Sequence, residues 1–343
     1  MKFSVIMPTL NSSKHIKNSL NGLAAQTLKN FELIAIDSGS TDDTLRLLSS
    51  YNSPDMPVRI FTAPDCSPAI ARNYGIDNTT GDYIAFCDSD DIMKPEMLEV
   101  MYDAAKRMGA DITICDFDMV YPEHIIESFS NLSDGEFRPD GNEIAEYYYQ
   151  FAAAPKPNNY VWSRIYKTEF LRENKARFSD TRYSEDNLFN LSLLIKKPQI
   201  THVGRSLYSY IQYDDSAMRT HIRRTNHGSL FLDSLKKASE VLTGEDKSLA
   251  EPILSIYAYT RVKSILFYSW LAKQPESETS TALDTFTKDD MVKRHLQMCI
   301  ERDYIGYYCR LHSYPAKWEQ LICEMVSACI GNGIMPDMSE VFA

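Results

Sequence analysis

The sequence has few glycines and no excess of positive charge, and each shortage excludes a class of protein. Only 13 of its 343 residues are glycine, and no GxGxxG pattern follows the first apolar segment, which excludes a dinucleotide-binding dehydrogenase. The 36 lysines and arginines are outnumbered by 47 aspartates and glutamates, and a net charge of −11 argues against nucleic acid as a partner. Any anionic substrate must therefore be met by a local cation or a metal ion.

Long apolar runs and paired cysteines are also missing. No stretch of about 18 uncharged apolar residues occurs, so we expect no membrane-spanning helix. The apolar run at the N-terminus is short and is interrupted by Pro8, which does not fit a secretion signal. The seven cysteines include no CxxC pair, and an odd number without a signal is typical of reduced thiols. We therefore expect a cytoplasmic protein, and leave open a peripheral contact with the inner face of the cell membrane.

The amino-acid composition is that of a globular protein. Hydrophobic residues are 44% and charged residues 24%, which excludes disordered and fibrous classes. At about 150 residues per domain, the length indicates roughly two domains. Short apolar segments alternate with helical patterns up to about residue 120, and from about residue 222 the pattern is helical only. We predict a first domain at 1–220 and a helical C-terminal domain at 221–343, and no oligomeric state is predicted.

The alternation in the first domain predicts a sheet covered by helices on both faces. The expected strands, which share apolar and β-branched side chains, are 3–7, 31–36, 58–62, 83–87 and 111–115. The helices expected between and after them are 12–26, 41–50, 67–77 and 95–108. Nearly continuous apolar strands separated by helices are typical of a mostly parallel, Rossmann-like α/β sheet. Farther along, the patterns predict helices at 142–153, 160–174 and 183–196 and short strands at 200–203 and 207–210.

Polar clusters follow three of the expected strands. These clusters are Pro8-Thr9-Leu10-Asn11, Asp37-Ser38-Gly39-Ser40-Thr41 and Asp88-Ser89-Asp90-Asp91. In open parallel sheets the binding crevice lies at the carboxyl ends of the strands, so we expect the clusters to converge on one ligand. Asp37 suits a carboxylate that hydrogen-bonds a base or a ribose, and a helix cap is the structural alternative.

The acidic cluster at 88–91 predicts a metal site. Three carboxylates within four residues repel each other unless a cation lies between them, and hard oxygen ligands select Mg²⁺ or Mn²⁺. A calcium loop is excluded, because its sixth position, which requires glycine, would be Met93. An acidic turn that caps the following helix is the alternative.

Arg72 lies between the second and third clusters, in the segment Ala71-Arg72-Asn73-Tyr74-Gly75. Its planar guanidinium group could bind a diphosphate or one of the neighbouring carboxylates. An isolated arginine is more often a surface residue, but the acidic cluster that follows favours a place in the site.

These segments, together with Ser184-Glu185-Asp186-Asn187-Leu188-Phe189, resemble the family 2 glycosyltransferases of the GT-A fold. The resemblance covers roughly residues 1–215 in the family's order and spacing. It implies an inverting transfer of a sugar from a nucleoside-diphosphate donor, expected to be a UDP-sugar. The acceptor it implies is a hydroxyl group of a glycan or of a lipid-linked oligosaccharide.

By this resemblance, Asp88-Ser89-Asp90 is the DxD motif, in which Asp88 and Asp90 hold Mn²⁺ or Mg²⁺. Asp37 would face the nucleobase. The residues expected to bind the donor are Pro8, Thr9, Asn11, Asp37, Ser38, Arg72, Asp88 and Ser89.

The resemblance also assigns the catalytic pair, with Asp186 as general base and Glu185 beside it. A carboxylate next to another carboxylate and near an aromatic wall has a raised pKa, which makes it a better base. The alternative is that both residues are caps that match the dipole of the helix they begin. Trp162 and Asp91 are expected on the acceptor side, where the flat face of Trp162 could stack on a sugar ring; a plain core tryptophan is the alternative.

One departure from the family pattern concerns the aromatic pair Tyr208 and Tyr210. Many relatives carry an arginine soon after this pair, whereas Ile211 and Gln212 follow it here, so no diphosphate-binding arginine can be carried over.

Two other functions are alternatives to that of a glycosyltransferase. A nucleotidyltransferase on a similar sheet would need a glycine-rich, lysine-containing loop after the first strand, and the first polar cluster has no glycine. A non-catalytic module that binds a nucleotide-sugar or a glycan is disfavoured by the acidic groups retained at both sites.

Overall fold

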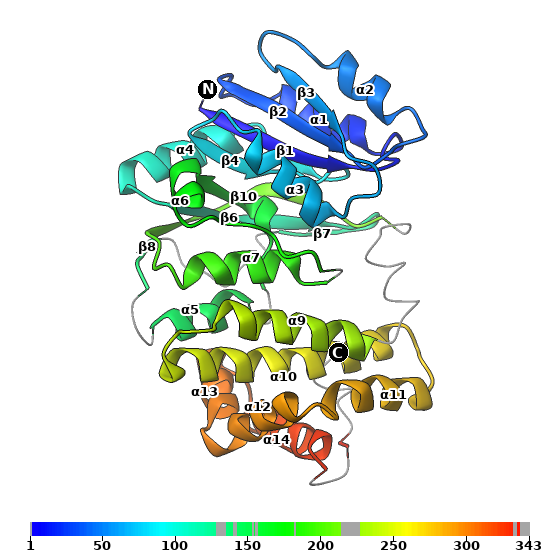
Figure 1. Ribbon diagram of the computed structural model, residues 1–343, viewed down its shortest axis with the longest axis vertical. Coiled ribbons are helices and arrows are strands. Elements are labelled where there is room, and N and C mark those ends of the chain that lie inside the picture. The colour runs from blue at the N-terminus through cyan, green and yellow to red at the C-terminus, as the bar shows by residue number, and fades with distance from the viewer. Residues whose placement is uncertain are drawn as a thin grey trace. The chain divides into compact units, whose positions relative to one another are not determined.

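The computed structural model divides the chain into two compact units, coloured along the chain in Figure 1. The first unit comprises Met1–Asp140 and Lys156–Tyr213, and the second comprises Gly141–Pro155 and Asp214–Ala343. The structure describes residues 2–127, 135–139, 143–152, 154, 157–181, 183–213, 227–331 and 335–336. The predicted domain boundary at residue 220 lies outside the described residues.

A ten-stranded sheet forms the centre of the first unit, with strand order β3-β2-β1-β4-β9-β6-β10-β5 and with β7 paired to β6 and β8 to β10. The strands are β1 Phe3–Thr9, β2 Phe31–Asp37, β3 Val58–Thr62, β4 Tyr83–Phe86, β5 Ile92–Met93, β6 Ile112–Val120, β7 Ile125–Ile126, β8 Gly135–Phe137, β9 Arg164–Lys167 and β10 Ile200–Ile211. Strands β3, β2, β1 and β4 are parallel, as are β6 and β10. The predicted α/β class with a Rossmann-like sheet is confirmed.

Helices cover this sheet. They are α1 Ile16–Ala24, α2 Thr44–Ser50, α3 Pro68–Asp77, α4 Met97–Met108, α6 Thr168–Glu173 and α7 Glu185–Leu194, with a short 3₁₀ helix at Val161–Ser163. Alternate residues of a strand point to opposite faces, and the buried Phe3, Val5 and Met7 belong to one core cluster with Leu20 of α1 and Met101 of α4.

Helix α3 packs directly on β1 and β2. A Cβ atom on Gly75 would lie 2.4 Å from Cγ2 of Ile6, so only glycine permits this approach. The helix begins at Pro68, and the Ser67 hydroxyl caps it by accepting from the Ile70 N–H at 3.3 Å. The backbone that carries Arg72 is therefore fixed against the sheet.

The segment 160–174, predicted as one helix, contains a strand. Strand β9 lies antiparallel between β4 and β6, where Ile165 pairs with Ala85 on one side and with Thr113 on the other. Pairing on both sides and burial of Ile165 outweigh the local helical pattern. The two short strands predicted at 200–203 and 207–210 are likewise joined in β10, with register shifts between Val203 and Tyr208.

The second unit is helical in its described part. Its helices are α5 Glu143–Ala152, α9 His227–Val241, α10 Lys247–Leu271, α11 Glu276–Thr287, α12 Asp290–Glu301, α13 Tyr304–Leu311 and α14 Ala316–Cys329. Helix α10 contacts α5, α9, α11, α12 and α13, and the Tyr149 hydroxyl donates to the Pro252 carbonyl at 3.0 Å. Helix α5 thus belongs to this unit, whereas the predicted boundary placed it in the first domain.

The sequence predicts that no helix of the chain spans a membrane. In the part of the chain that the structure describes, none of the helices combines the length and the apolar character needed to cross a bilayer.

Candidate active site

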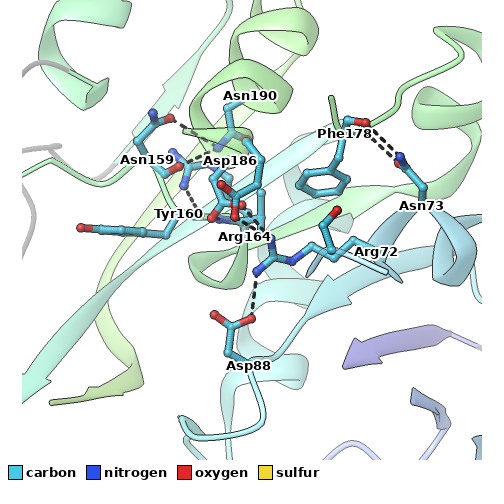
Figure 2. Close-up of polar contacts among 12 residues, drawn as sticks. Arg72, Asn73, Asp88, Asn159, Tyr160, Arg164, Phe178, Asp186 and Asn190 are labelled. Carbon is cyan, nitrogen blue, oxygen red and sulfur yellow. Dashed lines mark hydrogen bonds and ion pairs between the residues drawn. The ribbon is translucent and has the colours of Figure 1, made fainter. Parts of the chain in front are cut away.

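Arg72 joins carboxylates from two distant parts of the chain. Its Nη2 lies 3.0 Å from Oδ1 of Asp88, which follows β4. Its Nη1 lies 3.2 Å from Oε1 of Glu185 and 3.2 Å from Oδ1 of Asp186, both in the first turn of α7. Figure 2 shows the guanidinium group between Asp88 and Asp186. The structure therefore brings the predicted metal motif and the predicted catalytic pair to one side chain.

The guanidinium group of Arg72 is buried, with 5% of the side chain exposed. Burial opposes its charged form, but Asp186, Asp88 and Glu185 together raise the pKa of Arg72 above its ordinary value. Arg72 therefore stays a cation. In this structure Nη1 and Nη2 both contact carboxylates, which is one of the two predicted roles of Arg72.

Asp186 is a hydrogen-bonded carboxyl group with a raised pKa. Its Oδ1 accepts from Arg72, and its Oδ2 accepts from the backbone N–H of Val161 at 3.2 Å. Burial raises the pKa of Asp186 to about 7, while Arg72 opposes the rise and Glu185 and Asp88 add to it. A carboxyl group with this pKa is ionised in a large fraction of molecules at neutral pH and is still basic enough to take a proton.

The turn that begins α7 has an unusual backbone. Ser184 has a φ of 65°, in the left-handed region that residues other than glycine seldom adopt, and Glu185 and Asp186 follow at the helix N-terminus. Such a conformation persists where the surroundings enforce it, and it often marks a functional site. Four residues beyond Asp186, the Asn190 amide donates to the Asn159 carbonyl at 3.0 Å and anchors the helix.

Asp88, Ser89 and Asp90 lie on the turn after β4 and are partly exposed. Asp91 is 1% exposed, which does not fit the predicted place on the acceptor side. Its Oδ1 accepts from the Ile211 N–H at 2.9 Å, and its Oδ2 accepts from the Tyr208 hydroxyl at 3.0 Å. That hydroxyl in turn accepts from the Asp88 N–H at 3.2 Å, so Asp91 and Tyr208 support the acidic turn from β10.

The residues of this turn fit a divalent metal ion in part. Asp88 and Asp90 offer carboxylate oxygens, and Mg²⁺ or Mn²⁺ can be held by two carboxylates when phosphate oxygens and water complete the shell. Within the described ranges, no group of three or more His, Cys, Asp and Glu side chains is placed to hold a metal ion by itself. A metal at this turn would therefore depend on oxygens from a bound diphosphate.

Trp162 is a core residue. It is 2% exposed, and its indole ring is stacked between Tyr160 at 4.6 Å and Tyr208 at 4.5 Å between ring centroids. Phe117 meets it edge-on at 4.8 Å. Because both faces of the indole are covered, no face is open for a sugar ring, and the predicted stacking does not fit the structure.

Asp37 organises a loop. Its Oδ1 accepts from the hydroxyls of Thr9 at 3.2 Å and Ser40, and its Oδ2 accepts from the N–H groups of Gly39 at 3.0 Å and Ser40 at 2.8 Å. These four donors match the roughly four lone pairs of a carboxylate, and the side chain is 0% exposed. Asp37 therefore does not face a nucleobase directly, but shapes the loop at 38–41.

The loop at 38–41 is tied to the loop that follows β1. The Asn11 N–H donates to the Ser40 hydroxyl at 2.8 Å, and its side-chain oxygen accepts from the Thr41 N–H at 2.9 Å. Ser38 is buried, and its N–H donates to the Thr9 carbonyl at 2.8 Å. Pro8 pairs with Ile36 within the sheet.

Ser12 completes the link to the acidic turn, because its hydroxyl lies 2.8 Å from the hydroxyl of Ser89. The three polar clusters thus converge as predicted. Among the predicted donor ligands in these loops, Asn11 is exposed and Asp88 and Ser89 are partly exposed, whereas Thr9 and Ser38 are buried.

Three contacts in this region were not predicted. They are the Ser12 hydroxyl, the Val161 N–H that binds Asp186, and the pairing of Asn73 with Phe178. The last pair is 105 residues apart in sequence, so no local pattern could indicate it. Asn73 itself lies beside Arg72, in a segment whose sequence already indicated the site.

Known proteins share this fold and these sequence segments. The structure of the Staphylococcus aureus TarS fragment 1–349 in complex with UDP-GlcNAc matches with a TM-score of 0.69 and 21% identity, covering 96% of this chain and 92% of that one. Residues 4–153 match the model of glycosyl transferase family 2. Over residues 4–153 the chain is similar to the family 2 glycosyltransferases, and it shares the GT-A fold. The predicted resemblance to this family and the predicted enzyme class, a glycosyltransferase, are thereby confirmed.

Two further similarities extend the comparison of this glycosyltransferase. The uncharacterized glycosyltransferase YibD of Escherichia coli K12 is 24% identical over 254 residues, which cover 74% of this chain and 73% of YibD. The mannosyltransferase PcManGT from Pyrobaculum calidifontis, in complex with GDP-Man and Mn²⁺, matches with a TM-score of 0.54 and 15% identity, covering 96% of this chain and 86% of that one.

Proposed function

We propose that this glycosyltransferase moves a sugar from a UDP-sugar to a hydroxyl group of a glycan or of a lipid-linked oligosaccharide, with inversion at the sugar. The observation that carries the proposal is the bridge through Arg72, whose guanidinium group binds Asp88 on the metal side and Asp186 on the base side. Inversion by a single displacement needs a leaving-group site and a base that face each other across the sugar, and Arg72 binds both the Asp88 and the Asp186 carboxylate.

Asp186 is the proposed base. It would take the proton of the acceptor hydroxyl as that oxygen attacks the sugar, and its raised pKa supports this role. Arg72 and the Val161 N–H orient the carboxylate, and Glu185 shares Arg72 with it. Arg72 also keeps Asp88 in place beside the departing diphosphate.

Asp88 and Asp90 would hold Mn²⁺ or Mg²⁺ together with the donor. A bound divalent ion neutralises the charge of the departing diphosphate. Support comes from the partly exposed carboxylates of the turn and from the Mn²⁺ in the complex of PcManGT. Asn11 and Ser89 are proposed to contact the nucleotide-sugar directly, whereas Asp37 acts through the loop that it shapes.

UDP is the proposed nucleotide because TarS, which shares the fold over 96% of this chain, was solved with UDP-GlcNAc. A lipid-linked acceptor would place the enzyme, as a cytoplasmic protein, at the inner face of the cell membrane.

A donor panel tests the proposal. UDP-, GDP-, CMP- and dTDP-sugars are incubated with the enzyme and Mn²⁺, and released nucleotide and the shift in melting temperature are measured. We expect UDP-sugars to raise the melting temperature and to be hydrolysed slowly without an acceptor. Asp88→Asn, which alters a proposed metal ligand, should lose this hydrolysis, whereas its matched control Asp43→Asn, which changes an exposed carboxylate outside the acidic turn, should keep it. Absence of binding and hydrolysis with every donor would contradict the proposal.

A further inference from the structure

Asn73 pairs with the backbone of Phe178 through both atoms of its amide group (Figure 2). Its Nδ2 donates to the Phe178 carbonyl at 2.9 Å, and its Oδ1 accepts from the Phe178 N–H at 2.9 Å. A side chain must carry a donor and an acceptor side by side to make this pair, and among residues of this length only asparagine does. The pair fixes one residue of the segment that leads into α7 against α3.

The ring of Phe178 supports two parts of the site. On one side, Cζ of Arg72 lies 5.5 Å from the ring centroid. On the other side, Phe189 of α7 stacks on the ring at 4.0 Å with an angle of 1° between the planes. Phe86 of β4 closes the edge at 5.4 Å. The position of Phe178 therefore sets the spacing between Arg72 and the helix that carries Asp186.

Besides Asn73 and Arg72, Asp77 at the end of α3 and its cap Ser67 also contact this segment, at the surface. The Ser67 hydroxyl donates to Asp180 at 2.8 Å, and Arg177 pairs with Asp77, where 47% and 56% of the two side chains are exposed. Exposed pairs of this kind contribute little to stability or rigidity. Asn73 makes its two bonds in a partly buried place, so we expect it to dominate the attachment.

We infer that Asn73 is a positioning residue for sugar transfer: by holding Phe178, it fixes Arg72 and the first turn of α7 at the spacing that Asp186 needs to act on the acceptor hydroxyl. The inference rests on the proposed role of Asp186 as base. A misplacement of about 1 Å at a reacting group can lower a rate by about 10²-fold, so loss of this attachment should act mainly on kcat.

The test compares Asn73→Asp with Asn78→Asp. The first variant keeps the shape but loses the donor, and it turns a carboxylate toward the Phe178 carbonyl. The control changes the asparagine at the C-cap of the same helix, whose Nδ2 donates at 2.9 Å to the carbonyl of Tyr74 in α3. We expect Asn73→Asp to lower kcat on the order of 10²-fold, to leave the dissociation constant for UDP within about twofold, and to speed amide exchange in peptides that span 177–186. Asn78→Asp should do none of these.

The outcomes separate the inference from the proposed function. If both variants show the same kcat and the same exchange in 177–186, or if Asn73→Asp lowers kcat and UDP affinity equally, the inference is overturned. If the unmodified enzyme uses no donor, the proposed function fails. In that case, unchanged amide exchange of peptides spanning 177–186 in Asn73→Asp would separately overturn the proposed attachment of Phe178 by Asn73. Should Asn73→Asp not fold, Phe178→Leu, which keeps the backbone pair and removes the ring, is expected to show the same loss confined to kcat, and a normal kcat in it would overturn the inference.

Discussion

Arg72 holds Asp186 through Nη1 at 3.2 Å, while the other end of the same planar group holds Asp88. A lysine is a point charge on a flexible stem and cannot make both contacts together. We expect Arg72→Lys to lower kcat/KM by about 10²-fold in a transfer assay, because both carboxylates lose their shared orientation. Arg46→Lys, in an exposed pair with Asp43, is the control and should leave the value unchanged. Equal activity of the two variants would contradict the bridging role.

Replacement of the proposed base should separate catalysis from binding. Asp186→Asn keeps the size of the side chain but cannot accept the acceptor proton, so transfer should fall by about 10²–10⁴-fold with nearly unchanged donor affinity. Steady-state transfer and calorimetric titration with UDP measure the two quantities. Glu185→Gln should have the smaller effect. A larger effect of Glu185→Gln would reverse the two roles, and no effect of either would make both residues helix caps.

Activity and stability should depend on pH in opposite directions. Because burial raises the pKa of Asp186 from its ordinary value of 3.8 to about 7, kcat should fall as the pH drops below 7 and the base is protonated. Because the pKa of Asp186 is raised by folding, the folded state binds this proton more tightly than the unfolded state does. The stabilisation of the folded state by the protonated Asp186 is therefore present below pH 3.8 and is lost as the pH rises through 7.

Thermal unfolding of Asp186→Asn beside the unmodified enzyme checks this sign. The variant has no group that titrates at this position, so its melting temperature relative to that of the unmodified enzyme should rise between pH 5 and pH 8. If the melting temperature of the variant instead falls relative to that of the unmodified enzyme as the pH rises, the raised pKa of Asp186 is refuted.

The proposed metal should be removable. We expect EDTA to abolish transfer and Mn²⁺ or Mg²⁺ to restore it, because the proposed ion would be held only by two partly exposed carboxylates and a bound diphosphate. Asp90→Asn should shift the restoration curve to higher metal concentration, whereas the exposed control Asp43→Asn should not. Full activity of the unmodified enzyme and of Asp90→Asn in chelator would exclude the metal role.

Substitution of Asp37 distinguishes between two roles of this residue: shaping the loop at 38–41 and direct contact with the donor. Asparagine offers one acceptor oxygen where the carboxylate offers two, so Asp37→Asn leaves buried N–H groups without partners, at a cost of about 1–3 kcal/mol. We expect a lower melting temperature together with weaker UDP binding. Weaker binding at an unchanged melting temperature would instead show that Asp37 contacts the nucleotide.

The sequence predicts the parallel strands β1, β2 and β4 well, because each is a mostly apolar run with a proline or an aspartate at or near its end. It does not predict β9, since a four-residue strand between two others is recognised by its neighbours and not by its own pattern. Helix α5 was placed in the wrong unit for the same reason, as its partner α10 begins about a hundred residues later.

The sequence indicates which residues come together at the candidate site, but not what each of them does there. Local motifs indicate which polar side chains follow strands, and these do converge around Arg72. Whether a carboxylate faces a ligand or the interior depends on distant partners. Asp91 is bonded to Ile211 and Trp162 is enclosed by Tyr208, both contributed by β10, so their supporting roles could not be read from their own segments.

The chain enters the second unit at Gly141, returns to the first at Lys156 and leaves it again after Tyr213. A chain shortened at Tyr213 would keep α5 but delete α10, so that the fully buried Ile144 and the Tyr149 bonded to Pro252 would lose their covering. Such a fragment should aggregate unless 141–155 is replaced by a short linker as well. The helical unit is thus formed by two separate segments of the chain, and exchanging it between related enzymes requires that 141–155 and 214–343 be replaced together.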